Sequence, residues 1–233
     1  SYVLNNNKIF FVLTTALSDD HLISKWVKKH GDGVSEIAFS SDSVMDDYNY
    51  AIDNGASSHN IYEELVDSDG TYRIASVKTY GEVIHSFIDN SEYKGIWKPG
   101  YLSYSPDKVS MNKTDLLLVD HIVGNVELDK MDVWSEFYER VFGFTTFVRF
   151  DETDISTQYS ALKSIVVRSK NWKVMMPINE PAEGLKKSQI QEYIDFNNGA
   201  GVQHIALLTS DIISTISDLR KNGADFLDVP DNY

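Results

Sequence analysis

Cysteine is absent from the 233-residue sequence. Its absence excludes a disulfide framework, a thiolate zinc site, an iron–sulfur cluster and a cysteine nucleophile, so any metal ligands must be His, Asp or Glu. The chain also lacks a block of basic residues, because 35 acidic residues outnumber 21 basic ones and the net charge is −14. Nucleic acid is therefore a poor candidate partner, and the acidic surface mainly favours solubility.

Long apolar segments and several common motifs are missing as well. No hydrophobic run approaches the length of a membrane span and no basic leader is present, which predicts a cytoplasmic protein without membrane contact. Gly-x-Gly-x-x-Gly, Gly-Lys-Ser/Thr and Gly-x-Ser-x-Gly do not occur, so nucleotide binding and serine hydrolysis are poorly supported. Hydrophobic residues form 42% of the chain, which is enough for one large or two small globular domains.

An internal repeat organises what is present. Residues 33–39 (GVSEIAF) align with residues 201–207 (GVQHIAL), an offset of 201 − 33 = 168, and residues 54–56 and 222–224 (both NGA) match at the same offset. Two matches at one offset predict a duplicated unit of strand, helix and further strands. The first copy occupies residues 1–105, a linker follows at 106–118, and the second copy begins at 119. The front of the first copy and the end of the second are expected to be missing from residues 1–233.

Hydrophobic periodicity predicts the individual elements. Helices are expected at 43–53, 131–141 and 211–221, with Asp211 as an N-cap and Gly55 and Gly223 just past helix ends. An aromatic run in and after the middle helix predicts core packing, not a stacking platform: Trp134, Phe137, Tyr138, Phe142 and Phe144. Strands are expected at 36–39, 61–66, 71–88, 120–128, 159–168, 172–177 and 204–208.

Six histidines are the candidate nitrogen ligands. Three of them, His21, His30 and His59, lie among polar residues near turns or on a helix surface and are expected to be solvated. His85 lies within a strand, where a hydrogen-bonded or exposed histidine is favoured over a role in a pocket. These four positions are assigned no function.

His121 and His204 differ, because each lies near the start of a strand that leads into a helix. On a curved sheet such strands can run side by side and direct two imidazoles into one concavity, which a histidine pair that binds a metal requires. From the residues alone, buried structural histidines remain the favoured alternative. Glu36 takes the place of His204 in the first copy, which predicts that no equivalent site exists there.

Five segments occur in order along the second half: 119–126 (VDHIVGNV), 137–144 (FYERVFGF), 177–181 (PINEP), 187–190 (KSQI) and 199–206 (GAGVQHIA). This series closely resembles the 4-hydroxyphenylpyruvate dioxygenase family over essentially all of residues 119–233. Residues 1–100 resemble the family's non-catalytic N-terminal domain more loosely. The resemblance implies an α+β fold of the vicinal oxygen chelate type, also called the glyoxalase, bleomycin resistance and dioxygenase fold. In that fold, paired βαβββ modules form open curved barrels, and here the second barrel would be incomplete.

The resemblance also implies a metal and a reaction. In the family, two histidines and a carboxylate hold a non-haem Fe(II), so His121 and His204 would be ligands and the third, a glutamate, would lie beyond Tyr233. The implied enzyme is an oxidoreductase that converts 4-hydroxyphenylpyruvate and O₂ to homogentisate and CO₂ in tyrosine breakdown. Family members associate as dimers or tetramers. Without the third ligand, residues 1–233 alone are expected to be inactive.

Pocket residues carry over where the family's motifs match. Ser164, Asn179 and Gln189 would supply polar contacts to the substrate, and Val123 and Pro177 would shape an apolar wall. From the residues alone, Ser164 and Asn179 could instead form hydrogen bonds with backbone groups, and Gln189 could be a helix-surface residue.

One pocket position fits the strand pattern poorly. Gln203 belongs to the family's pocket set, but strict strand alternation would turn it away from the face that carries His204.

Two other functions remain open. A hydroxymandelate synthase uses the same substrate and metal, although segments 177–181 and 187–190 resemble the dioxygenase more. A metal-free binding protein on the same fold is the alternative from another class, and a longer reading frame would exclude it.

Overall fold

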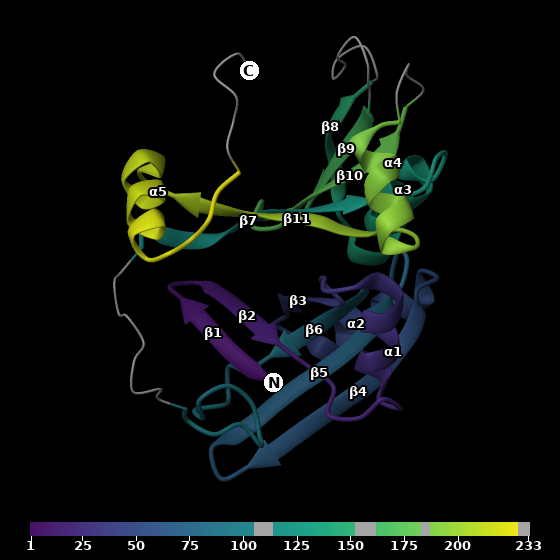
Figure 1. Cartoon of the computed structure of the whole chain (residues 1–233). Helices are drawn as coiled ribbons and strands as arrows, with labels where there is room; N and C mark the ends of the chain where they lie inside the picture. Colours follow the sequence, from purple (N-terminus) through teal and green to yellow (C-terminus); the bar gives the residue numbers. More distant parts are fainter. Residues whose placement is uncertain (105–113, 152–161, 183–186, 228–233) are drawn as a thin grey trace.

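A computed structural model describes residues 1–104, 114–151, 162–182 and 187–227 (Figure 1). Two expectations fall partly between these ranges: most of the linker at 106–118, and the start, at 159–161, of one expected strand lie outside the described residues. Within the described ranges, no helix is both long and apolar enough to span a bilayer.

Two units of the chain share one topology. The first contains β3 (Glu36–Ser40), α2 (Val44–Asp53), β4 (Ser57–Asp67), β5 (Gly70–Lys78) and β6 (Ile84–Asp89). The second contains β7 (Leu116–Asn125), α3 (Met131–Phe142), β8 (Thr145–Phe150), β9 (Leu162–Arg168) and β10 (Met175–Pro181). Their strand orders are β3-β6-β5-β4 and β7-β10-β9-β8, and in each the first and last strands run parallel. The expected pair of βαβββ modules is confirmed, as open sheets.

The remaining elements extend both ends of this arrangement. A hairpin of β1 (Tyr2–Asn6) and β2 (Ile9–Leu13) and helix α1 (Leu22–His30) precede the first unit. Helix α4 (Gln189–Asn197), strand β11 (Gly201–Thr209) and helix α5 (Ile212–Lys221) follow the second. β11 pairs with β7, so the second sheet has five strands in the order β11-β7-β10-β9-β8.

The helix boundaries follow the repeat. Helices α2 and α5 begin at residues 44 and 212, an offset of 212 − 44 = 168, and each has ten residues. Asp211 accepts hydrogen bonds from the backbone N–H groups of Ile213 and Ser214, as the expected N-cap. Gly55 and Gly223 both have φ +89° just past the helix ends, a conformation that glycine adopts without strain.

Two expected strands differ in their boundaries from the observed ones. The segment 71–88 is two antiparallel strands, β5 and β6, which reverse direction near Gly81 at φ +59°. The strand expected at 172–177 begins at Met175, because Trp172 closes a turn by donating its backbone N–H to Ser169 O. The alternation of apolar and polar residues continues in the sequence across such turns, so the pattern does not reveal where a strand ends.

The aromatic run of α3 lies in the core, as expected. Phe142 packs with Phe39 of β3 and Phe87 of β6, and Tyr138 packs against Phe142, so the two halves of the chain share one hydrophobic core. The ring of Tyr80 approaches Gly124 of β7 so closely that a Cβ there would lie 2.7 Å from it. This packing fixes the second sheet against the first.

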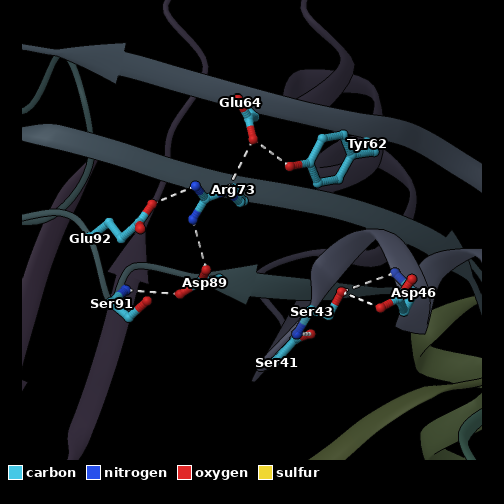
Figure 2. A network of polar contacts seen from close by, with 9 residues as sticks. All are labelled: Ser41, Ser43, Asp46, Tyr62, Glu64, Arg73, Asp89, Ser91 and Glu92. Carbon is cyan, nitrogen blue, oxygen red and sulfur yellow. Dashed lines mark hydrogen bonds and ion pairs between the residues drawn. The ribbon is translucent and has the colours of Figure 1, made fainter.

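One arginine of the first sheet pairs with three carboxylates (Figure 2). Arg73 on β5 donates to Glu64 at 3.0 Å, to Asp89 at 3.0 Å and to Glu92 at 2.5 Å. Tyr62 adds a hydrogen bond of 2.6 Å to Glu64. All the groups in this network are mutually paired, so it is interpreted as structural.

Candidate metal centre

The pairing of β7 with β11 brings His121 and His204 together. The strands are antiparallel, with His204 opposite Val123 and Ala206 opposite His121. Directly opposite residues share a face of a sheet, so both histidines lie on one face, and their ring centroids are 5.8 Å apart. Figure 1 shows these strands running side by side between α5 and the rising strands β8–β10. His121 is half-buried and His204 is exposed.

Each of the two histidines follows a β-bulge. Between Val202 and His204 the register advances by one residue on β7, which leaves Gln203 as the extra residue of β11. Farther along, Ala206 and Leu207 face residues 121 and 119, which leaves Asp120 as the extra residue of β7. Bulges of this kind re-aim neighbouring side chains and are frequent beside active sites.

The bulged residues orient the imidazole rings. Asp120 Oδ2 lies 2.7 Å from His121 Nδ1, and Gln203 Oε1 lies 3.0 Å from His204 Nδ1. Carboxylate and amide oxygens only accept hydrogen bonds, so each Nδ1 carries the proton and each Nε2 keeps a free lone pair. This is the arrangement in which metal-binding histidines are held by outer partners.

Gln203 therefore corrects one argument from the sequence. Strict alternation placed its side chain away from the face of His204, but the bulge breaks alternation at this residue. Its amide contacts the ring of His204. Tertiary pairing, which the sequence pattern does not contain, decides where a bulge falls.

The pKa of His204 is lowered by partial desolvation of the ring and, to a smaller degree, by the nearby His121. Both causes disfavour the imidazolium form. A metal ligand must be a neutral imidazole, so the environment favours the binding-competent form of this residue.

Four of the expected pocket residues share the face of the histidine pair. Val123 is buried two residues after His121, and Asn179 of β10 lies beside Asn125 in the parallel pairing. Ser164 of β9 is opposite Asn179 and is also buried. Pro177 follows the same alternation on β10 and is half-buried. The sheet thus presents an apolar and polar wall next to the histidines.

Gln189 is placed differently. It is the exposed first residue of α4, directly after the capping Ser188, whose hydroxyl accepts from Gln191 N. This position agrees with the alternative of a helix-surface residue.

Two residues without an expected role belong to this face or its support. Asp120 accepts a hydrogen bond from His121 Nδ1. The sequence feature that could have indicated this role is a carboxylate directly before a candidate ligand. Asn125 is fully buried, accepts from Asn179 Nδ2 at 3.4 Å, and its own Nδ2 has no partner in the part of the chain that is described. A buried N–H without an acceptor is destabilising, and such a group is suited to receive an acceptor from a ligand.

The histidine pair has no third ligand within residues 1–104, 114–151, 162–182 and 187–227. No cluster of three or more His, Asp or Glu side chains able to hold a metal occurs in these ranges. The described site thus offers two imidazole nitrogens on one face.

Two other histidines are internal. His85 is fully buried, donates from Nδ1 to Ile84 O and accepts at Nε2 from the Tyr138 hydroxyl at 2.6 Å, so the expectation of a hydrogen-bonded strand histidine is confirmed. Burial lowers its pKa to about 4. His30, expected to be solvated, is 4% exposed. That expectation is wrong because α4, far along the sequence, covers the end of α1.

Comparisons with known proteins show which proteins the chain is similar to. Residues 118–233 match the Glyoxalase/Bleomycin resistance protein/Dioxygenase superfamily. The whole chain is 43% identical to 4-hydroxyphenylpyruvate dioxygenase of Aspergillus fumigatus and covers 62% of it. It is 42% identical to the enzyme of the same name from Dictyostelium discoideum and covers 65% of that protein. The chain thus spans somewhat less than two thirds of the curated relatives it matches.

Solved structures support the fold. A triple mutant of 4-hydroxymandelate synthase from Streptomyces coelicolor superposes with a TM-score of 0.81 over 98% of this chain and 64% of that protein, at 24% identity. This likeness concerns the architecture alone. Residues 118–233, the second half of the chain, thus match the glyoxalase/bleomycin resistance protein/dioxygenase superfamily.

Proposed function

We propose that this chain provides two histidine ligands of a non-haem Fe(II) centre in a 4-hydroxyphenylpyruvate dioxygenase. The observation that carries the proposal is the pair His121 and His204, on adjacent strands with ring centroids 5.8 Å apart and each Nδ1 held by the preceding residue. The similarity of the whole chain to several proteins of that name supports the same reaction.

The donor set fits a metal of this kind. Two neutral imidazoles suit iron, and a carboxylate, proposed to come from outside the described residues, would complete a facial triad with open positions. Asp120 would raise the basicity of His121, and Gln203 would fix the orientation of His204. When bound, Fe(II) would supply the redox chemistry that activates O₂ and allows decarboxylation and ring hydroxylation to homogentisate and CO₂.

The remaining residues of the face would bind and orient the substrate. Val123 and Pro177 would pack against its aromatic ring and exclude water. Ser164 and Asn179 are buried polar groups that would hydrogen-bond its oxygens. Gln189, exposed at the start of α4, is retained as a substrate contact on the family resemblance alone.

The experiment uses a protein in which residues 1–233 are followed by a complete second domain. After reconstitution with Fe(II), we expect O₂ uptake with 4-hydroxyphenylpyruvate and homogentisate as the product by chromatography. Hydroxymandelate as the product would identify the synthase reaction instead. Binding of the substrate without metal and without turnover would favour a binding protein. A polypeptide of residues 1–233 alone is expected to form no homogentisate, because the described residues supply only two ligands.

A further inference from the structure

The strand that carries His204 starts from a turn that the first half of the chain holds. This α4–β11 turn consists of residues 197–201, directly before the bulge at Gln203. Asn197 lies inside the turn and is buried, and its side chain donates to Gly199 O and Ala200 O. At Gly81, between β5 and β6, a Cβ would lie only 2.2 Å from Ala200 O, so the two backbones are in close contact.

Two hydrogen bonds tie the turn to the end of α1, and they are related by the internal repeat. His30 Nδ1 donates to Asn197 O at 2.5 Å, and Asn198 Nδ2 donates to Lys29 O at 2.6 Å. At the offset of 168, residue 30 corresponds to 198 and residue 29 to 197. Each side chain thus donates to the carbonyl that precedes its counterpart, a reciprocal exchange between the ends of α1 and α4.

His30 also contacts another part of the first half. Its Nδ1 donates to the carbonyl of Asn197, and its Nε2 lies 3.2 Å from the carboxylate of Glu82, in the turn between β5 and β6. The ring thus bridges the β5–β6 turn and the α4–β11 turn.

The ring of His30 is buried and has charged and aromatic neighbours. Its side chain is 2% exposed, and Glu82, from the turn between β5 and β6, is its paired carboxylate. Lys29 also pairs with Glu82, and Lys29 and His30 both hold the pKa of that carboxyl below its usual value. The ring centroid of Trp26 lies 4.8 Å from that of the imidazole, with the two planes tilted by 42°, and Tyr193 of α4 lines the same small cavity.

We propose that His30 is a positioning residue for the histidine pair. Its ring fastens the α4–β11 turn to the first half of the chain, and so sets the place from which β11 presents His204. Only the consequence for metal binding rests on the proposed function, since the fastening itself does not need a metal.

Amide hydrogen exchange of the peptide that covers the α4–β11 turn tests the proposal. We expect protection, corrected for the intrinsic rate, to fall about tenfold in His30→Ala, since a buried hydrogen bond to the turn is lost. The variant His30→Asn keeps a side-chain donor and should retain more protection than His30→Ala. Asn198→Ala removes the other hydrogen bond of the exchange and should lower protection by a similar factor.

The controls separate this mechanism from general unfolding. His59→Gln changes an exposed histidine on β4 and should leave the wild-type exchange profile unaltered. Protection of the turn in His30→Ala equal to that of the wild-type protein would overturn the proposal. If His30→Ala does not fold, Asn198→Ala decides: lower protection of the turn supports the proposal, and unaltered protection overturns it.

Metal binding distinguishes the proposal from the proposed function. Ni(II), used as a probe of the histidine pair, should bind several-fold more weakly to Asn198→Ala than to the wild-type protein. Failure of the wild-type protein to bind Ni(II) would contradict the proposed function, and the exchange data would still decide the role of His30. Unchanged Ni(II) affinity in Asn198→Ala, with faster exchange of the turn, would refute the link between the turn and His204.

Discussion

The two copies of the repeat place different groups at equivalent positions. In the first copy, Glu36 of β3 corresponds to His204, and its carboxylate accepts a hydrogen bond of 2.5 Å from Ser86 of the neighbouring strand β6. β3 ends its sheet as described, with β6 as its neighbour. In the second copy, β11 pairs with β7, the first strand of a module, and two histidines meet. β11 corresponds to β3, so both β7 and β11 are strands that precede a helix. The ligand pair forms only where two such strands are hydrogen-bonded neighbours.

The largest difference between the copies should appear when each equivalent position is truncated. His204→Ala removes one of the two described ligands, and we expect metal affinity to fall by more than about 100-fold and activity to disappear with it. Glu36→Ala is the matched control and should retain the metal. Iron content measured by atomic emission after desalting checks both variants, and an iron-replete His204→Ala protein would contradict the ligand assignment.

The bulge before each histidine allows a sharper comparison. Asp120→Asn keeps the shape of the bulged residue but removes the negative charge beside His121 Nδ1, and we expect metal affinity to fall by about 10- to 100-fold. Gln203→Ala removes a neutral acceptor and should have the smaller effect. Competition titration with a chromophoric chelator measures both affinities. Equal affinities for wild type and Asp120→Asn would argue against a role of the carboxylate in orienting the ring.

His85 offers the opposite case, a histidine of the first half that is fully buried. Its pKa of about 4 in the folded protein lies below the value of 6.5 expected when unfolded. The unfolded chain therefore takes up a proton first as pH falls from about 6.5 to about 4, so folding stability should decline by up to about 1.4 kcal/mol per pH unit. Above pH 6.5 this residue adds no dependence.

Urea denaturation at several pH values measures that decline. The double variant His85→Leu with Tyr138→Phe removes both partners of the buried hydrogen bond, so it should lose this part of the slope without leaving an orphaned polar group. A double variant as pH-sensitive as the wild-type protein would show that other groups cause the decline.

The smallest effect is expected at the polar wall. Asn179→Ala should leave iron content unchanged and lower kcat/KM for 4-hydroxyphenylpyruvate by about fivefold, which corresponds to about 1 kcal/mol for a neutral hydrogen bond. Steady-state kinetics at saturating O₂ provide the measurement, and Ser210→Ala, at the other end of β11, is the control. Kinetics identical to wild type would make Asn179 a structural residue.

Local signals in the sequence determined much of the fold. The offset of 168 placed α2 and α5, and Asp211, Gly55 and Gly223 marked helix ends, because caps depend on residues close in sequence. The two histidines stood out for a similar reason, since each begins the same strand-to-helix pattern.

Other features depended on tertiary structure alone. The bulges at Asp120 and Gln203 arise from how β7 and β11 pair, and no local pattern records that register. The burial of His30 arises because α4, more than 150 residues later, covers the end of α1. The sequence by itself determined which side chains were available as ligands and which segments form helices and strands. Only the tertiary structure decided how the rings are aimed and which histidines are buried, because both depend on contacts between residues far apart in the chain.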